Sequence, residues 1–307
     1  MEGVVDFTMR NVLTRVGGYD HCVTEFVRVT NLLLPARVFK RFCPELNNNS
    51  KTPAGTPIRI QLLGSNPDAM AENAYRATEL GSPGIDINFG CPSKTVNRSD
   101  GGSILLKTPN RVFDIVSAIR KKLPAEQPVS AKLRLGYEDK SLFLENALAA
   151  IEGGASEITV HARSKVDGYK PPAHWEYIAK IREAVSVPVI ANGDIWSVDD
   201  YWRCREITGC EHVMIGRGAL RKPGLARDIK KSIANEEPQP HNWTDITELL
   251  LSFCDLTATH YKSQYIANRI KQWTSFLKKT YPEAETLFKS IKRLNEPEEI
   301  YNALRNG

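Results

Sequence analysis

The first 220 residues alternate between short apolar, β-branched runs and longer amphipathic segments. The apolar runs predict seven strands, near Cys22–Val27, Ile58–Leu63, Gly84–Phe89, Val129–Leu135, Glu157–His161, Pro188–Ala191 and His212–Ile215. The segments between them predict helices at Asp68–Leu80, Arg111–Lys122, Leu142–Gly153, Trp175–Val185 and Val198–Ile207. Parallel strands need crossover connections of this length, so the alternation predicts a parallel sheet covered by helices.

A closed (β/α)₈ barrel needs eight strands, one more than the sequence predicts. The chain opens at Met1 with a segment typical of the loop and helix that follow a strand. We therefore expect an α/β fold, a TIM (β/α)₈ barrel whose first strand is missing from this sequence, through truncation or a wrongly assigned start. The alternative is a true seven-stranded or open sheet. Without an eighth strand, two sheet edges would be unpaired.

The alternation stops after Leu220. Pro238 and Pro240 are typical of a linker, and the pattern from Trp243 to Leu304 is helical. An apolar stripe at helical spacing runs through Ile266, Ile270, Trp273 and Leu277. We predict a barrel domain over residues 1–237 and a small α-helical domain over residues 238–307.

The positive charge is concentrated in this helical tail. The whole chain carries +5, whereas residues 260–293 hold eight Lys or Arg against two Glu, a net +6. The remainder of the chain is therefore at −1. This asymmetry indicates a polyanionic partner, with nucleic acid as the first candidate.

The composition excludes several classes of protein. No run of eighteen apolar residues is present, and the N-terminus lacks a basic region followed by an apolar stretch, which argues against membrane and secreted proteins. The six cysteines show no CxxC spacing, so we expect free thiols in a reducing cytoplasm and no metal site.

Polar residues occupy several predicted strand ends, where barrel enzymes place their chemistry. Gln61 can bind the edge of a planar heterocycle, Lys132 stands on an otherwise apolar strand, and His161 ends the next one. Two glycine loops follow the last two strands, at Asn192-Gly193-Asp194 and Gly216-Arg217-Gly218. Such loops bind phosphate in barrels. Together these residues predict a pocket for a phosphorylated flat cofactor, and FMN fits it well.

Cys91 lies in a Gly-Cys-Pro turn directly after the strand near Gly84–Phe89. Gly90 permits unusual backbone angles and Pro92 fixes the next one, so we expect a rigidly held thiol that faces the ligand crevice. A lone cysteine at a strand end is more often a packing residue, and His161 alone is more often structural. The joint occurrence of these residues at successive strand ends favours the functional interpretation.

The motifs taken together resemble a known family. They are Met1-Glu-Gly-Val, Gln61-Leu-Leu-Gly, Asp86-Ile-Asn-Phe-Gly-Cys-Pro-Ser-Lys, Lys132-Leu-Arg-Leu-Gly, Val160-His-Ala-Arg, Ile190-Ala-Asn-Gly-Asp and Met214-Ile-Gly-Arg-Gly. They are similar to those of the tRNA-dihydrouridine synthases, over essentially the whole chain. Other segments most resemble the bacterial C-type subfamily, which acts on uridine 16 of the tRNA D-loop: Thr24-Glu-Phe-Val-Arg28, Lys94-Thr-Val-Asn and Arg269-Ile-Lys-Gln-Trp273.

The resemblance implies an FMN-containing barrel followed by a helical tRNA-binding domain. NADPH reduces the flavin, hydride passes to C6 of the uracil, and Cys91 matches the general acid that protonates C5. The positions that match flavin contacts are Met1, Gln61, Lys132, His161, Asn192, Gly193, Asp194, Gly216 and Arg217. We expect a monomeric, cytoplasmic enzyme.

Five residues are assigned to RNA by the same resemblance. Arg28, Asn88 and Tyr169 are expected at the barrel mouth, and Arg269 and Lys271 on the basic helices. The alternative for the last two is a solvated helix face. Two other functions stay open at this stage: an FMN barrel that acts on free pyrimidines, and a non-catalytic tRNA-binding flavoprotein.

Overall fold

The computed structural model describes residues 1–306, and the chain divides into two compact units. The first, here called the sheet unit, comprises His21–Ile195 and Asp199–Met214. The second, the helical unit, comprises Met1–Asp20, Trp196–Val198 and the chain from Ile215 onward. The predicted domain division at 237/238 stays a prediction, because these units are defined by compactness and interleave along the chain.

The sheet unit is built on parallel strands. Their bounds are β1 Cys22–Val23, β2 Val27–Arg28, β3 Ile58–Leu63, β4 Ile85–Asn88, β5 Val129–Arg134, β6 Glu157–His161, β7 Val189–Asn192 and β8 His212–Met214. Every ladder between them is parallel, in the order β1-β3-β4-β5-β6-β7-β8, and β2 also pairs with β3. Among the described residues no pairing joins β8 to β1.

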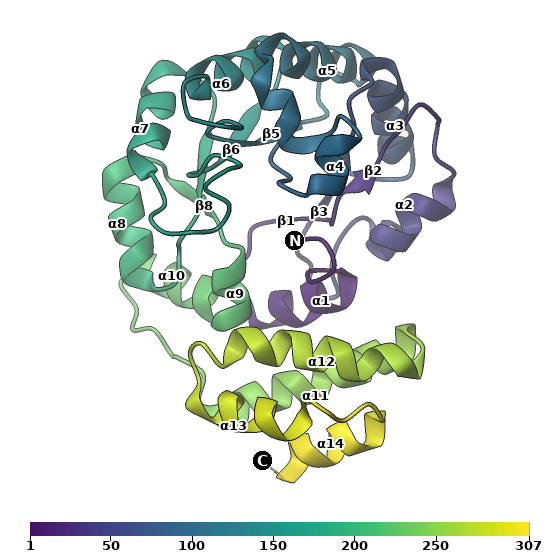
Figure 1. Ribbon diagram of the computed structural model, residues 1–307, viewed down its shortest axis with the longest axis vertical. Helices are drawn as coiled ribbons and strands as arrows, with labels where there is room; N and C mark the ends of the chain where they lie inside the picture. The colour runs from purple at the N-terminus through teal and green to yellow at the C-terminus, as the bar shows by residue number, and fades with distance from the viewer. Residues whose placement is uncertain (307) are drawn as a thin grey trace. The chain divides into compact units, whose positions relative to one another are not determined.

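Helices surround these strands (Figure 1). Their bounds are α2 Ala36–Phe42, α3 Pro67–Glu79, α4 Lys94–Arg98, α5 Pro109–Lys122, α6 Phe143–Glu152, α7 Trp175–Ala184 and α8 Val198–Thr208, with 3₁₀ turns at Pro44–Asn48 and Gly102–Lys107. The five predicted helices are confirmed to within two residues. Strands inside and helices outside give a TIM-like barrel, so the predicted fold class is confirmed.

The predicted strand Cys22–Val27 is wrong as a single element. It is two strands of two residues each, separated by residues 24–26. The Thr24 hydroxyl accepts the backbone N–H of Gln61 at 3.0 Å. The side chain of Thr24 thus accepts a hydrogen bond that a backbone carbonyl would accept in a continuous strand. The strand pairing is interrupted at this point.

Local signals explain where the helices begin. The side chain of Asn66 accepts the N–H of Ala69 at 3.0 Å, and Pro67 occupies the first turn of α3. The inner face of this helix is lined by alanines and by Met70, all of them buried. Small residues on this face allow the helix to pack closely against the strands.

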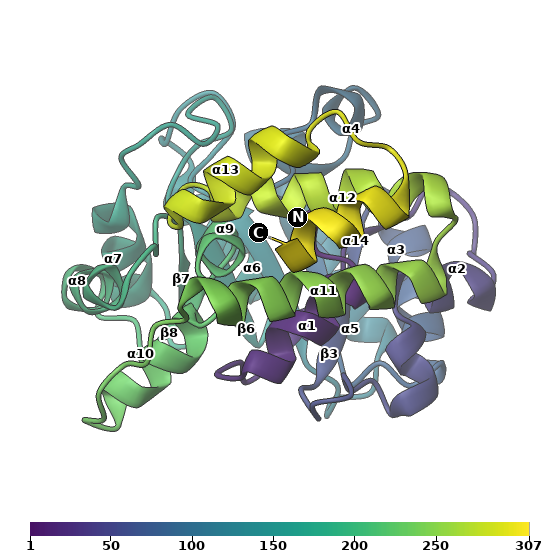
Figure 2. The same ribbon diagram turned by 90° about the horizontal axis from the view of Figure 1, so that it is seen from below.

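The helical unit has its own hydrophobic core. Its helices are α1 Phe7–Val16, α9 Arg217–Arg221, α10 Leu225–Ile233, α11 Trp243–His260, α12 Ser263–Leu277, α13 Pro282–Ile291 and α14 Pro297–Asn306. Helix α1 runs beside α11 (Figure 2), although hundreds of residues separate them in sequence.

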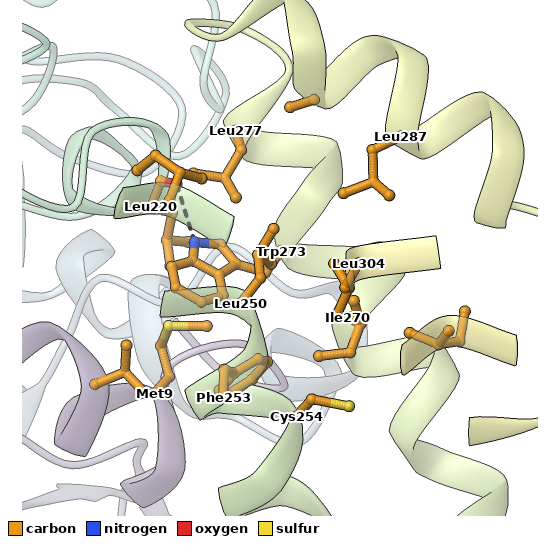
Figure 3. Packing of buried hydrophobic residues seen from close by; sticks show 14 of the residues in the cluster. Met9, Leu220, Leu250, Phe253, Cys254, Ile270, Trp273, Leu277, Leu287 and Leu304 are labelled. Atoms are coloured by element: carbon orange, nitrogen blue, oxygen red, sulfur yellow. Dashed lines mark hydrogen bonds between the residues drawn. The ribbon is translucent and has the colours of Figure 1, made fainter. Parts of the chain in front are cut away.

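Trp273 lies at the centre of this core (Figure 3). It donates a hydrogen bond from Nε1 to the carbonyl oxygen of Leu220 at 3.1 Å and packs edge-on against Phe253 at 5.2 Å between ring centres. The rest of the predicted apolar stripe on α12 is buried with it, so the interpretation of that stripe as helix core is confirmed. No helix within residues 1–306 is long and apolar enough to cross a membrane.

Candidate active site

Cys91 follows β4 and is fixed through its own backbone. Its carbonyl oxygen accepts hydrogen bonds from the N–H and hydroxyl of Ser103, at 3.1 and 2.8 Å, and from Nδ2 of Asn97 at 2.9 Å. The side chain is half-buried and packs against an apolar cluster of Phe26, Leu63 and Val96. The turn therefore holds the thiol in one place at the end of a strand.

Gly90 does not adopt the unusual backbone conformation that we expected, because it is not among the residues with positive φ. That expectation was wrong. A Cβ at this position would lie 3.4 Å from Cγ of Arg134, at the border of ordinary van der Waals contact.

A directed series of hydrogen bonds leads away from this turn. The N–H of Gly90 donates to Oδ1 of Asn88 at 2.9 Å, and Nδ2 of Asn88 donates to Oε1 of Gln61 at 2.7 Å. Nε2 of Gln61 then donates to Oδ2 of Asp86 at 2.6 Å, and the Ser130 hydroxyl donates to Oδ1 of Asp86, also at 2.6 Å. Burial raises the pKa of Asp86, while the hydrogen bonds from Ser130 and Gln61 oppose that change.

Lys132 lies on β5 beside Asn88 of β4 in the strand register. Its ammonium donates a hydrogen bond to Oδ1 of Asn192 at 3.2 Å, and Nδ2 of Asn192 donates to the carbonyl oxygen of Met214 at 2.7 Å. Burial, and then the nearby positive charge of Arg134, lower the pKa of Lys132 to about 8. The structure thus brings Lys132 and Asn192 together, and the amide positions a lysine whose pKa is lowered.

His161 and the Asn192–Asp194 loop approach each other closely. Gly193 has φ of +125°, and a Cβ there would lie 3.1 Å from Cδ2 of His161. The side chain of Arg163 is fully buried, and its Nη1 atom lies 3.4 Å from Nε2 of His161. Its Nη2 atom donates a hydrogen bond to Oδ2 of Asp194 at 2.5 Å. Asp194 is therefore ion-paired, and Gly193 is the residue that lets the loop pass the imidazole.

Arg134 holds several backbone segments of the site together, and we did not assign it from the sequence. Its Nε donates to the carbonyl oxygen of Gly90 at 2.8 Å, and Nη1 donates to the carbonyl oxygens of Ser164 and Gly168 at 2.9 and 3.0 Å. Its guanidinium lies 5.3 Å from the ring centre of Tyr169, and burial lowers its pKa. Arg134 and Lys132 are two residues apart on one strand, so their side chains share a face; that spacing was the available signal.

Tyr169 and Arg28 are the exposed members of the predicted set within the sheet unit. Tyr169 is 54% exposed, and its ring centre lies 6.1 Å from that of His161. Arg28 ends β2 and is exposed. Both side chains are accessible to a large ligand, as residues predicted to contact RNA must be.

Three predicted cofactor residues lie in the helical unit. Gly216 precedes the short helix α9, and the guanidinium of Arg217 lies 5.0 Å from the ring centre of Trp196. A Cβ at Gly216 would meet Sδ of Met1 at 3.6 Å, an ordinary contact. Their predicted contacts with a cofactor stay predictions.

The two predicted RNA-binding residues of α12 differ in their surroundings. Arg269 forms an ion pair with Asp6 at 2.7 Å and donates to the Thr8 hydroxyl at 3.0 Å. It also lies 4.8 Å from the ring centre of Tyr261, whose hydroxyl donates to the same Asp6. Lys271 makes only longer contacts, to the carbonyl oxygen of Lys292 at 3.5 Å and Oδ1 of Asn295 at 3.4 Å. Arg269 is therefore not a merely solvated residue.

The sheet unit thus collects a thiol, amide N–H donors and two cationic groups near the carboxyl ends of β3 to β7. Cys91 packs against apolar side chains. Residues 1–306 contain no group of three or more His, Cys, Asp or Glu side chains arranged to bind a metal ion. The arrangement suits a flat ligand with carbonyl oxygens and negative charge.

Known proteins with similar sequences span the whole described chain. The profile of the family "Dihydrouridine synthase (Dus)" matches residues 1–306. The tRNA-dihydrouridine(16) synthase of Shewanella oneidensis is 56% identical over 307 residues, which are 100% of this chain and 96% of that protein. The proteins of the same name from Pseudomonas syringae pv. tomato and Vibrio cholerae are 51% and 48% identical, covering 98% and 99% of this chain and 95% and 93% of their own lengths.

Two solved structures support the fold alone. A 2-naphthoyl-CoA reductase aligns with a TM-score of 0.56 at 12% identity, over 76% of this chain and 47% of that one. Histamine dehydrogenase from Rhizobium sp. 4-9 also gives a TM-score of 0.56, at 14% identity over 83% of this chain and 47% of its own. The extent of the sequence matches leads to one conclusion: the chain belongs to the dihydrouridine synthase family.

Proposed function

We propose that this chain reduces uridine 16 in the D-loop of tRNA to 5,6-dihydrouridine, with FMN as bound cofactor and NADPH as reductant. The family reduces uridine in tRNA to dihydrouridine with a flavin, and relatives at 48–56% identity are named for position 16. The observation that carries the proposal is the fixed thiol of Cys91 at the same sheet edge as Lys132 and the Asn88–Gln61 amides.

The residues of the sheet unit fit a flavin. Lys132 is a cation that donates a hydrogen bond to the neutral amide of Asn192, so its charge is available to an anionic group. The contacts of Gln61 and Asn88 use one N–H of each amide, and the second N–H can donate to a carbonyl oxygen of the ring. The absence of a side chain at Gly193 keeps the approach to His161 open.

We assign the cofactor to these residues as follows. Gln61 and Lys132 would bind the ring, and His161, with the loop from Asn192 through Gly193 to Asp194, would bind its remaining polar groups. Met1, Gly216 and Arg217 complete the assignment from the resemblance alone. When bound, FMN reduced by NADPH would supply the hydride that C6 of the uracil receives.

The chain's own residues perform the other steps. Cys91 holds the proton on Sγ that C5 of the uracil receives, and its fixed backbone orients that proton donor. The ammonium of Lys132 stabilises negative charge that develops on the ligand. Arg28, Asn88 and Tyr169 would bind the RNA near the reacting base.

Binding to the body of tRNA would offset the cost of extruding the base, a few kcal/mol. Arg269 and Lys271 on α12 are the proposed contacts, on a surface that reads the phosphate backbone and the RNA shape. We accordingly propose catalysis by residues 1–237 and tRNA binding by residues 238–307. The monomeric state and the cytoplasmic location belong to the same proposal.

The proposed function is tested by Cys91→Ala, with Cys22→Ala as the matched control. Cys22 is also half-buried and lies on β1, so its loss controls for the removal of a thiol. We expect Cys91→Ala to keep bound flavin and its reduction by NADPH but to form dihydrouridine at least about 100-fold more slowly, the contribution of a positioned acid. Unchanged dihydrouridine formation in Cys91→Ala, or reduction of free uracil by the wild type, would contradict the proposal.

A further inference from the structure

The hydrogen bonds between Gly90 and Asp86 all point in one direction. Gly90 N–H can only donate, and an ionised Asp86 carboxylate can only accept. Between them lie two amides, Asn88 and Gln61, that could each face either way by a half-turn of the amide group. Each passes a hydrogen bond on in the same sense, at 2.7 and 2.6 Å.

The direction decides what the two amides offer to a ligand. Each carbonyl oxygen accepts one hydrogen bond within the series and each NH₂ group donates one, so both side chains keep an N–H group that can donate to a ligand. If the amides were reversed, Gly90 N–H would face an amide NH₂ group, and a half-buried donor would lose its acceptor. The Gly90 hydrogen bond beside Cys91 therefore depends on the orientation of Gln61.

Asp86 is suited to impose this orientation. It is 2% exposed, and its two oxygens separately accept from Ser130 and Gln61. Burial raises the pKa of Asp86, and the hydrogen bonds from Ser130 and Gln61, with the charges of Lys132 and Arg59, oppose that change in favour of the ionised form. Linked hydrogen bonds polarise one another, so a charged acceptor at one end strengthens the whole series.

We propose that Asp86 is a positioning residue for the reaction: it fixes the direction of the Gln61 and Asn88 amides, so that both present N–H donors to carbonyl oxygens of the ligands and the Cys91 turn keeps its Gly90 hydrogen bond. This inference rests on the proposed function for its effect on turnover. Its effect on the Gly90 amide does not.

The neighbouring Ser130 provides a matched control. In Asp86→Asn the amide at position 86 can face either way, because the Ser130 hydroxyl can donate or accept. Only Gly90 N–H then still favours the observed direction. In Ser130→Ala the carboxylate of Asp86 remains acceptor-only, and the direction survives.

The first measurement is hydrogen exchange at the Gly90 amide in wild type, Asp86→Asn and Ser130→Ala. We expect Ser130→Ala to exchange within about 3-fold of wild type and Asp86→Asn at least about 5-fold faster, because the half-buried Gly90 hydrogen bond is weakened. The kcat for tRNA should fall in Asp86→Asn more than in Ser130→Ala, with KM for NADPH unchanged. A purely structural role of Asp86 predicts lower stability without faster exchange at Gly90 in particular.

Normal Gly90 exchange in Asp86→Asn would overturn the inference. Asp86→Asn combined with Ser130→Asp moves the acceptor-only carboxylate one step along the series. This double variant should restore slow Gly90 exchange relative to Asp86→Asn alone, and failure to do so would also overturn the inference. If Asp86→Asn alone does not fold, the double variant is compared with wild type and should exchange at Gly90 within about 3-fold of it. A wild type that forms no dihydrouridine would refute the proposed function, while the exchange result would still decide the role of Asp86.

Discussion

Arg134 donates a hydrogen bond from Nε to the carbonyl oxygen of Gly90 at 2.8 Å, one residue before Cys91. The same guanidinium holds the carbonyl oxygens of Ser164 and Gly168, next to Tyr169. One side chain thus connects the turn that carries the thiol with the loop that carries an exposed aromatic residue. The proposed proton donor and a proposed RNA contact are therefore held by the same side chain.

Arg134→Lys should impair turnover on tRNA more than it impairs flavin binding. A lysine keeps the charge but cannot make three hydrogen bonds in the forked geometry of a guanidinium. We expect kcat/KM for tRNA to fall about 10- to 100-fold, as for the loss of one or two charge-assisted hydrogen bonds, with flavin content within 2-fold (about 0.4 kcal/mol) of wild type. Single-turnover oxidation of the reduced enzyme by tRNA measures this. Equal losses of flavin and turnover would show a general collapse of the site instead.

Lys132 should make flavin affinity depend on pH. Its pKa of about 8 in the free protein means that the ammonium loses its proton as pH rises through that value. Binding of an anionic ligand favours the charged form, so affinity should fall by up to about 10-fold per pH unit above pH 8. Titration of apoprotein with FMN between pH 7 and 9.5 tests this.

Lys132→Met is the control for that titration, because it removes the charge of Lys132. Any pH dependence that remains in this variant belongs to the flavin itself.

The stability of the protein without flavin should depend on pH in the opposite sense. The folded pKa lies below the unfolded value, so the unfolded chain binds more protons between about pH 8 and 10.4. Wild type without flavin should therefore gain stability relative to Lys132→Met as pH rises through this window. A parallel pH dependence of the two melting temperatures would contradict the lowered pKa.

Arg269 and Lys271 should separate stability from RNA binding. Arg269→Ala leaves Asp6 without its ion-pair partner in a largely buried setting, which we expect to cost about 2–3 kcal/mol of unfolding free energy. Lys271→Ala removes only long contacts and should cost less than about 0.5 kcal/mol. Both should weaken tRNA binding and reduce its salt dependence.

Denaturant unfolding and filter binding at several salt concentrations distinguish the two residues. If Arg269→Ala lowers stability but leaves tRNA affinity of the folded protein unchanged, Arg269 is a structural residue and its assignment to RNA is wrong. Loss of affinity in Lys271→Ala alone would then locate the RNA contact on the more exposed side chain.

Gly193→Ala should destabilise the protein, whereas Gly216→Ala should not. Gly193 combines φ of +125° with a Cβ position 3.1 Å from His161, so the substitution should cost about 1–3 kcal/mol. At Gly216 the added methyl group would make an ordinary contact with Met1, and stability should change by less than about 0.5 kcal/mol. Melting curves of both variants without flavin test the pair.

The sequence predicted most of the fold because each element carries its own local signal. Apolar runs and amphipathic segments located seven strand positions and five helices, and glycine or proline at the joins set their limits to within two residues. The division of the first strand was missed because it depends on a hydrogen bond between Thr24 and Gln61, which are far apart in sequence. The short helices α2 and α4 contain too few turns for a periodic pattern.

The site was predicted less completely than the fold. Residues at strand ends, such as Gln61 and Lys132, could be selected because their polarity conflicts with a buried strand. Arg134 was not selected, since its role depends on three carbonyl oxygens that only the folded chain brings together. The ion pair of Arg269 with Asp6 was missed for the same reason: its partners are 263 residues apart.

The most direct test of the account is the absorption spectrum of the purified protein under anaerobic conditions, first with NADPH and then with tRNA that lacks dihydrouridine. We predict a flavin band that bleaches with NADPH, returns on addition of this tRNA, and leaves dihydrouridine at position 16. The same tRNA with position 16 already reduced should not restore the band. A protein that takes up no FMN, or a reduced flavin that tRNA does not reoxidise, would contradict the central claim.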